Sequence, residues 1–225
     1  MSLTVSATSG GFTQVPEGQH QAVCYRLVDS GTIDDVYPKG SDNPSKKRKL
    51  LHIFWELPEQ LTDSGKPMMI SKSYTHSLHE SSTLHRDLTG WRGKAFTEED
   101  LAGFDLCKVL GVSAVLEVKL NMNGNAKVQG IFKPDGGAKK TETANELEAF
   151  DIDVYCNEFN GNMGDESKAM CDIYDSLPPW MQEDITGSYE VRAAQGVETT
   201  KPKTAVESLA ELAKPVEDFD DDIPF

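Results

Sequence analysis

The chain has 225 residues, of which 37 are Asp or Glu and 22 are Lys or Arg, so its formal net charge is −15 at pH 7. This length suits one domain with appendages, and a hydrophobic share of 38% without a long apolar run argues against a membrane protein. The acidity excludes a nucleic-acid coat held by overall charge, so binding of a polyanion requires a local basic groove.

The four cysteines (Cys24, Cys107, Cys156 and Cys171) are far apart and form no Cys-x-x-Cys pair. We therefore expect free thiols in a reducing compartment rather than a disulfide framework or a zinc ribbon. Residues 1–12 carry neither a basic segment nor an apolar one, so we expect no secretory signal and a cytoplasmic location, in a bacterial host cell.

Three strands are predicted in the first third of the chain, over residues 20–28, 50–57 and 68–76. In the second of these, alternation places Trp55 on the face of Leu51, Ile53 and Leu57, which indicates a core position. Phe54 falls on the opposite face.

The period then changes to that of a helix. Leu84, Leu88 and Trp91 recur at helical spacing, so Trp91 is also expected in the core, and Gly93 is predicted to end the helix. Thr97 precedes three acidic residues and predicts the N-cap of a second short helix.

Strand patterns return at residues 114–120 and 126–133, joined by an Asn- and Gly-rich turn that favours a hairpin. Residues 150–155 (FDIDVY) predict a sixth strand on which Asp151 and Asp153 point outward. Residues 169–185 predict two short helices broken at Pro178-Pro179.

Three strands, a helical insert and a two-stranded hairpin form the order of an oligonucleotide/oligosaccharide-binding (OB) barrel. We therefore predict a mainly β fold, a five-stranded OB barrel with a helical insert and helical additions, over residues 1–190. Residues 191–216 are predicted to be a linker with a short helix. Residues 217–225 form an acidic tail that is too charged and short to fold alone.

Binding of single strands without sequence preference needs cations along the backbone path and aromatic faces for the bases. The run from Lys46 to Lys49 is expected in the loop between the first two strands, where such barrels grip ligands. A covered sheet face remains an equal alternative for Phe54, Lys72 and Tyr74. The candidate DNA-binding residues are Lys46, Lys47, Arg48, Lys49, Phe54, Lys72, Tyr74, Lys119 and Lys127, with Lys133 as a further lysine on the hairpin.

An acidic run followed by an apolar terminus ends the chain. A terminal ring can fill a pocket while the acids steer the peptide to a basic rim, so this end is typical of a partner-binding ligand. It resembles the C-terminal tail of bacterial and phage single-stranded DNA-binding proteins, a resemblance that implies recruitment of replication and repair enzymes. The predicted partner-binding residues are Asp220, Asp221, Asp222, Ile223, Pro224 and Phe225.

A second resemblance covers roughly residues 15–190. This part of the chain looks like a family of phage and prophage proteins associated with single-stranded DNA binding. The resemblance does not identify individual contact residues. It is carried by Trp55-Glu-Leu57, residues 70–75 (ISKSYT), Leu88, Trp91-Arg-Gly-Lys94, Phe96-Thr97, Phe104-Asp-Leu106 and Leu110-Gly111.

Enzyme motifs are missing from the sequence. It has no phosphate-binding GxxxxGK[ST], no GxGxxG after a strand and no GxSxG elbow. His79-Glu80 begins like a zinc-protease helix, but Thr83 occupies the position of the second histidine. We therefore expect no catalytic residue, no cofactor and no metal.

The sequence predicts sequence-independent binding of single-stranded DNA in replication, recombination or repair, of a phage, with enzymes recruited through the tail. The alternative is an adaptor or inhibitor that binds a replication enzyme through its tail and hardly touches DNA; a small nuclease is a third hypothesis. Because the tail is acidic, it is expected to compete with DNA for the basic site. The oligomeric state stays open.

Overall fold

A six-stranded sheet organises the part of the chain that the computed structural model describes, residues 14–35, 46–161 and 164–197. Neighbouring strands follow the order β3-β2-β1-β4-β5, and β6 pairs with β1 outside this path. All pairs are antiparallel except β1 with β6. The strands are β1 (Gly18–Asp35), β2 (Lys46–Leu61), β3 (Pro67–Thr75), β4 (Ser113–Leu120), β5 (Ala126–Phe132) and β6 (Glu148–Phe150).

The predicted mainly β class is confirmed, but the described sheet is not a closed barrel. Among the described residues, the edge strands β3 and β5 share no ladder. They nevertheless lie close together, because the Lys72 ammonium on β3 donates to the Gln129 carbonyl on β5 across 3.4 Å. Since these strands are the two ends of the five-strand path, the sheet must curl for them to meet.

Helix α1 (Thr83–Arg92) confirms the predicted helix and its end. The Ser82 side chain caps it by accepting from the His85 N–H, and Gly93 ends it in the left-handed region, with φ 66°. A Cβ at Gly90 would lie 2.5 Å from the Ile131 carbonyl oxygen, so the helix backbone lies directly against β5. Helix α1 therefore covers the gap between β3 and β5.

Two shorter helical elements follow α1: α2 (Glu98–Ala102) and the 3₁₀ helix η1 (Leu106–Val109). Thr97 caps α2 as predicted, in a reciprocal capping box with Asp100. The Arg92 guanidinium donates to Asp100 across 2.7 Å and lies 4.3 Å from the centroid of the Phe96 ring. These contacts attach α2 to the end of α1.

The first core fills the concave side of the sheet beneath α1. Trp55 and Trp91 are 0% and 2% exposed, with ring centroids 6.0 Å apart, which confirms both core predictions. The indole N–H of Trp91 donates to the Ser113 carbonyl. Other buried members of this first core include Leu27, Leu51, Ile53, Leu57, Leu84, Leu88, Leu116, Val118 and Ile131.

The predicted strand over residues 150–155 is wrong beyond Phe150. Asp151 accepts from the backbone N–H groups of Asp153 and Val154 and so caps a helix, because a short carboxylate at this position satisfies the free donors of a helix start. The predicted helix break at Pro178-Pro179 is confirmed. The C-terminal helices are α3 (Ile152–Cys156), α4 (Asp165–Ser176), α5 (Pro179–Thr186) and α6 (Tyr189–Ala194), of which α6 runs across residue 190.

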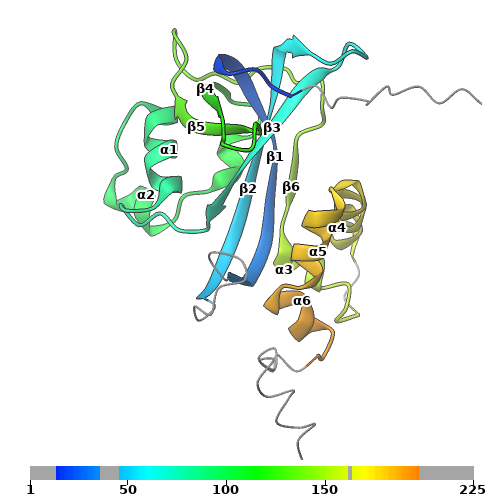
Figure 1. Ribbon diagram of the computed structural model, residues 1–225. Helices are drawn as coiled ribbons and strands as arrows, with labels where there is room; N and C mark the ends of the chain where they lie inside the picture. Colours follow the sequence, from blue (N-terminus) through cyan, green and yellow to red (C-terminus); the bar gives the residue numbers. More distant parts are fainter. Residues whose placement is uncertain (1–13, 36–45, 162–163, 198–225) are drawn as a thin grey trace, which may run out of the picture.

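Helices α3 to α6, the helical layer, lie along β1 and β2 on the side away from α1 (Figure 1). A second core fills this interface. Gly31 of β1 has φ +75°, and a Cβ there would lie 2.4 Å from the Ile152 Cδ1 and 2.7 Å from a Glu190 carboxylate oxygen. Glycine therefore permits the close contact of α3 and α6 with β1. The second core contains Tyr25, Val28, Phe54, Phe150, Ile152, Tyr155, Cys156, Leu177, Met181, Ile185 and Val191.

None of the helices among the described residues combines the length and apolar composition that a bilayer span requires.

Candidate nucleic-acid interface

The basic run lies in strand β2 and not in a loop, which corrects the predicted placement. β1 and β2 extend beyond their predicted ends, and their register places Asp34 opposite Lys47, a favourable cross-strand pair of charges. Lys46, Lys47 and Arg48 are exposed. The Lys47 ammonium lies 3.7 Å from the centroid of the Tyr189 ring on α6. The run therefore lies beside the helical layer.

Lys49 is the most enclosed member of the run. Its ammonium lies 2.9 Å from the Asp29 carboxylate and 3.8 Å from that of Asp153. Burial, the largest single cause, lowers the pKa of Lys49, but the hydrogen bond that its ammonium donates to Asp29 and the nearby carboxylates outweigh burial, so the pKa is raised. Lys49 thus joins β1, β2 and α3 and is less available to a ligand than its neighbours.

Lys72 and Tyr74 belong to a buried network on the inner side of β3. The Lys72 ammonium lies 2.6 Å from Asp87 Oδ2, and the Tyr74 hydroxyl donates to the same oxygen across 3.1 Å. Burial, followed by the Asp87 charge, raises the pKa of Tyr74 well above its usual range. These residues attach α1 to β3, and Tyr74 offers no ring face to solvent.

Phe54 is buried in the second core, with its ring 6.2 Å from that of Tyr25. It nevertheless lines a cavity of about 450 Å³ on the outer face of β1, β2 and β3. We call this cavity the aromatic groove. Its lining residues are Tyr25, Arg26, Phe54, Met69, Ile70, Ser71, Asn145, Ser176, Pro178 and Trp180.

Trp180 forms one wall of the aromatic groove from the first turn of α5. Its side chain is 48% exposed, whereas Trp55 and Trp91 are buried. The ring meets that of His52 at 65° with centroids 5.7 Å apart. Burial lowers the pKa of His52 to about 4, so this imidazole is neutral at physiological pH, and its Nδ1 lies 2.9 Å from the Ser73 hydroxyl. Trp180 therefore rests on a fixed neutral ring.

Arg26 supplies the cation of the aromatic groove. Its Nε donates to a Glu148 carboxylate oxygen across 2.6 Å and its Nη2 donates to the Ser176 hydroxyl across 3.1 Å. The guanidinium also lies 5.7 Å from the centroid of the Tyr25 ring. These partners fix the orientation of Arg26 before any ligand arrives, while Glu148 offsets part of its charge.

Glu56 holds the segment on which Asn145 lies. The Glu56 side chain is buried, and its carboxylate accepts from the backbone N–H groups of Ala144 and Asn145. The Asn145 amide nitrogen donates to it across 2.6 Å. Because the nitrogen of this amide donates to the carboxylate, the amide oxygen remains available as an acceptor.

Lys119 and Lys127 lie on the outer face of β4 and β5, directly opposite each other and both exposed. The Lys119 ammonium lies 3.0 Å from a Glu117 carboxylate oxygen. In the strand order, β1 separates these strands from β2 and β3. The two lysines are therefore not part of the aromatic groove.

Comparisons with protein-family models, curated proteins and solved structures find no match. The resemblance to single-stranded DNA-binding proteins thus rests on the residues quoted above. The predicted partner-binding residues from Asp220 to Phe225 lie outside the described residues.

Within residues 14–35, 46–161 and 164–197, no group of three or more His, Cys, Asp or Glu side chains is arranged to hold a metal ion. Burial raises the pKa of the Cys156 and Cys171 thiols to about 11, so both are protonated at neutral pH. What the aromatic groove offers instead is ring faces, one oriented guanidinium, hydroxyls and an amide. That set suits noncovalent binding of a planar ring that carries an anionic group.

Sequence reasoning missed Trp180 and Arg26. Trp180 gave no local signal, because residues in the first turn of other helices, such as Leu84 in α1 and Ile152 in α3, are fully buried. Arg26 gave no such signal, because its partner Glu148 is 122 residues away. Only the tertiary structure brings the two together.

Proposed function

We propose that this protein binds single-stranded DNA without sequence preference in the aromatic groove, in replication, recombination or repair. The observation that carries the proposal is the groove itself, in which the half-exposed Trp180 ring lies near the oriented Arg26 guanidinium. Ring faces and cations are what a protein needs to hold single strands regardless of sequence.

The strand order supports the same function. β1, β2 and β3 are followed by α1 and then by β4 and β5, and the free edges of β3 and β5 approach each other beneath α1. A partly open OB barrel has the same order of strands and helix, and that fold binds oligonucleotides on the face of its second and third strands. The aromatic groove lies on that face.

In this proposal one base stacks on Trp180 at the open side of the groove, above the floor of Tyr25 and Phe54. A base stack of this kind contributes ~1–3 kcal/mol. The exposed lysines Lys46 and Lys47, at the far end of β2, meet phosphates further along the strand. No base edge has to be read, so the preference among sequences is small.

Because the net charge is −15, the affinity for DNA is expected to depend on salt concentration. Electrostatic repulsion is screened beyond ~8 Å at physiological salt, so local cations can still hold phosphates. Affinity should fall as salt rises, because each neutralised phosphate releases counterions.

Fluorescence titration of the full chain tests the proposal directly. Trp180 is exposed while Trp55 and Trp91 are buried, so quenching by oligo(dT) has to report on position 180. Trp180→Phe should abolish the quenching with binding retained, and Trp180→Ala should raise the Kd at least about 5-fold. Met122→Ala, at a fully exposed apolar residue of the β4–β5 turn, is the matched control. Unchanged affinity in Trp180→Ala would overturn the proposal.

The acidic terminus favours the second candidate, an adaptor that recruits a replication enzyme. Deleting residues 217–225 separates the two. If the tail competes with DNA for the cations, the shortened chain should bind oligo(dT) more tightly than the full chain. If neither chain binds oligo(dT) at low salt, the adaptor is the better description.

A further inference from the structure

A second open surface lies on the outer face of β1, β4 and β5. Pairing places Gln21, Val115 and Phe132 in one row across the three strands, and Glu117 and Gly130 share the next row with Gln19. The alternate residues Ala114, Leu116 and Val118 point into the first core. Neither α1 nor the helical layer covers this face (Figure 1).

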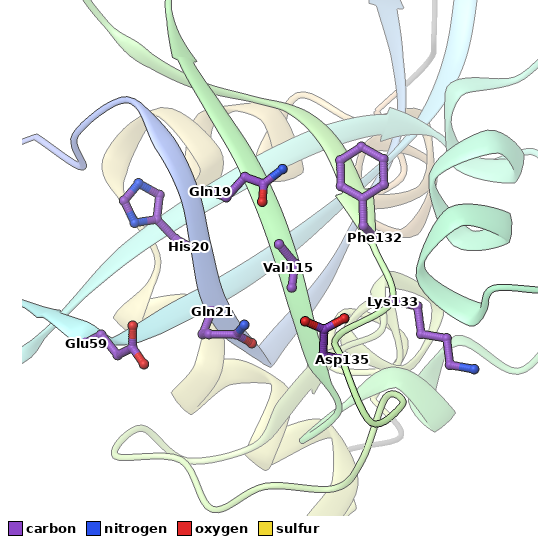
Figure 2. Close-up of a pocket in the computed structure, with 8 residues that line it drawn as sticks. All are labelled: Gln19, His20, Gln21, Glu59, Val115, Phe132, Lys133 and Asp135. Atoms are coloured by element: carbon purple, nitrogen blue, oxygen red, sulfur yellow. The ribbon is translucent and has the colours of Figure 1, made fainter.

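Phe132 lies flat on this face. A Cβ at Gly130 would be 2.9 Å from the Phe132 Cζ, so the ring lies across the glycine, where any other residue would push it away. The ring is 45% exposed. Figure 2 shows it face on, beside Gln19 and Val115. A ring held flat with one face open is a stacking platform.

A cavity of about 370 Å³ adjoins this ring. Besides Phe132 it is lined by polar amides and by one cation, Lys133, at the end of β5 (Figure 2). The Lys133 stem packs against the position of Gly93 at the end of α1. Acidic residues also line it: Glu59 lies on the side of β1 and β2, and Asp135 follows Lys133 in the chain.

Cations and acids alternate around the face. Lys127 and Lys133 lie at the two ends of β5, with Asp135 next to Lys133 and Glu117 beside Lys119 on β4, while Glu17 and Glu59 lie toward β1 and β2. Glu17 already accepts from the Leu120 N–H. The side chains that could meet phosphates are therefore Lys127 and Lys133, with the bases directed over Phe132 and the sheet toward β1.

The pairing of two lysines supports an anion at this end. Lys127 faces Lys119 directly, and like charges at such a position destabilise a sheet unless a counter-charge lies between them. In the described part of the chain, the Glu117 carboxylate forms its ion pair with Lys119, so an anion beside Lys127 would reduce the remaining repulsion. Lys119 lies four residue steps along β4 from Val115, the partner of Phe132, a distance of about 13 Å. A DNA strand that contacts both the Lys119–Lys127 pair and Phe132 would span more than one nucleotide.

We infer that this face is a second contact site for single-stranded DNA, with one base stacked on Phe132 and phosphates along Lys127 and Lys133. The inference rests on the proposed function and extends it, because the strand held in the aromatic groove continues around the sheet to this face. Long oligonucleotides then contact both surfaces, while short ones occupy the aromatic groove alone.

A tryptophan moved between the two surfaces tests this. In the full chain carrying Trp180→Phe and Phe132→Trp, position 132 holds an exposed tryptophan. An oligo(dT) of about 30 nucleotides should quench it, and one of about 6 should quench it far less, since a single OB-type site spans ~4–16 nucleotides. The chain carrying Trp180→Phe and Leu101→Trp, at an exposed residue of α2 that lines neither surface, is the matched control and should not be quenched. Absence of quenching by the long oligonucleotide at position 132 would overturn the inference.

Affinity distinguishes this inference from the proposed function. Phe132→Ala should raise the Kd for the long oligonucleotide at least about 5-fold and leave the Kd for the short one unchanged. Equal affinity of Phe132→Ala and the unchanged chain for the long oligonucleotide would refute the second site. Trp180→Ala tests the first site separately, since it should weaken binding of both lengths.

Discussion

The two cores of this protein differ in how they are built. The first core is assembled from the strands and α1 and borders the buried Asp87 carboxylate, which pairs with Lys72 and Tyr74. The second core, on the opposite face of β1 and β2, is closed by helices of 5 to 12 residues and borders the buried polar residues His52 and Ser30. One sheet thus packs against α1 on one face, forming the first core, and against the helical layer on the other face, forming the second core.

The difference matters for stability and for binding. Isolated helices shorter than about 12–15 residues are marginal in water, so the helical layer depends on its contacts with β1 and β2. Helix α1, with 10 residues, depends in the same way on its contacts with β3 and β5. The aromatic groove lies at the edge of the second core and is bordered by Phe54 and Trp180, so the residues of the proposed site depend on how the layer packs.

The largest expected effect is in the first core. Trp55→Ala should lower the free energy of unfolding by about 3–5 kcal/mol, because it leaves a large cavity beside Trp91. Urea denaturation followed by circular dichroism measures this. A loss below about 1 kcal/mol would contradict the view that this core holds the fold together.

Met181→Ala should act more locally. Met181 is fully buried in the second core, and its truncation should cost about 2–4 kcal/mol. Hydrogen exchange should accelerate at amides of α4 and α5 while those of β4 keep their protection. Equal acceleration in β4 would mean that the two cores unfold as one unit.

Acidification should weaken the second core through His52. The pKa of His52 is about 4 in the folded chain and 6.5 in the unfolded chain, because burial disfavours the charged form. The unfolded chain therefore binds the proton first. Stability from this group is complete above pH 6.5 and is lost as the pH falls from 6.5 to about 4, by at most ~3 kcal/mol.

Denaturation midpoints of His52→Gln between pH 7 and pH 4 check the effect, since the variant should lose part of the pH slope. His76→Gln, at a partly exposed histidine, is the control. A slope in His52→Gln equal to that of the unchanged chain would contradict this role.

The smallest effect should be at Trp180. Because its ring is half exposed, Trp180→Ala should change the free energy of unfolding by less than about 1 kcal/mol. A larger loss in thermal denaturation would identify Trp180 as part of the second core. Its binding phenotype would then need the Trp180→Phe variant for interpretation.

Local pattern was enough for much of the fold. Alternation located the first three strands and the inward face of Trp55, and helical spacing located α1 with its end at Gly93. The strand prediction over residues 150–155 failed at Asp151, which caps α3. An Asp that caps a helix and an Asp on the outward face of a strand give the same alternation of polar and apolar residues.

The interface was less accessible to sequence reasoning. Alternation along the strand correctly placed Phe54 on the face opposite Trp55. The residues that cover that face, such as Met181 and Ile185, lie on a helix more than 100 residues later in the chain. The same holds for Lys72, whose partner Asp87 lies on α1. Whether a polar side chain faces solvent or a buried partner depends on such distant contacts, which periodicity does not encode.

Gly31 offers a way to uncouple the halves of this molecule. A methyl group at that position would clash with Ile152 and Glu190, so α3 and α6 would be displaced from β1. The first core around Trp55 would stay intact. Gly31→Ala would therefore keep the first core and displace the helical layer that borders the aromatic groove, so one substitution would show whether the sheet folds without that layer.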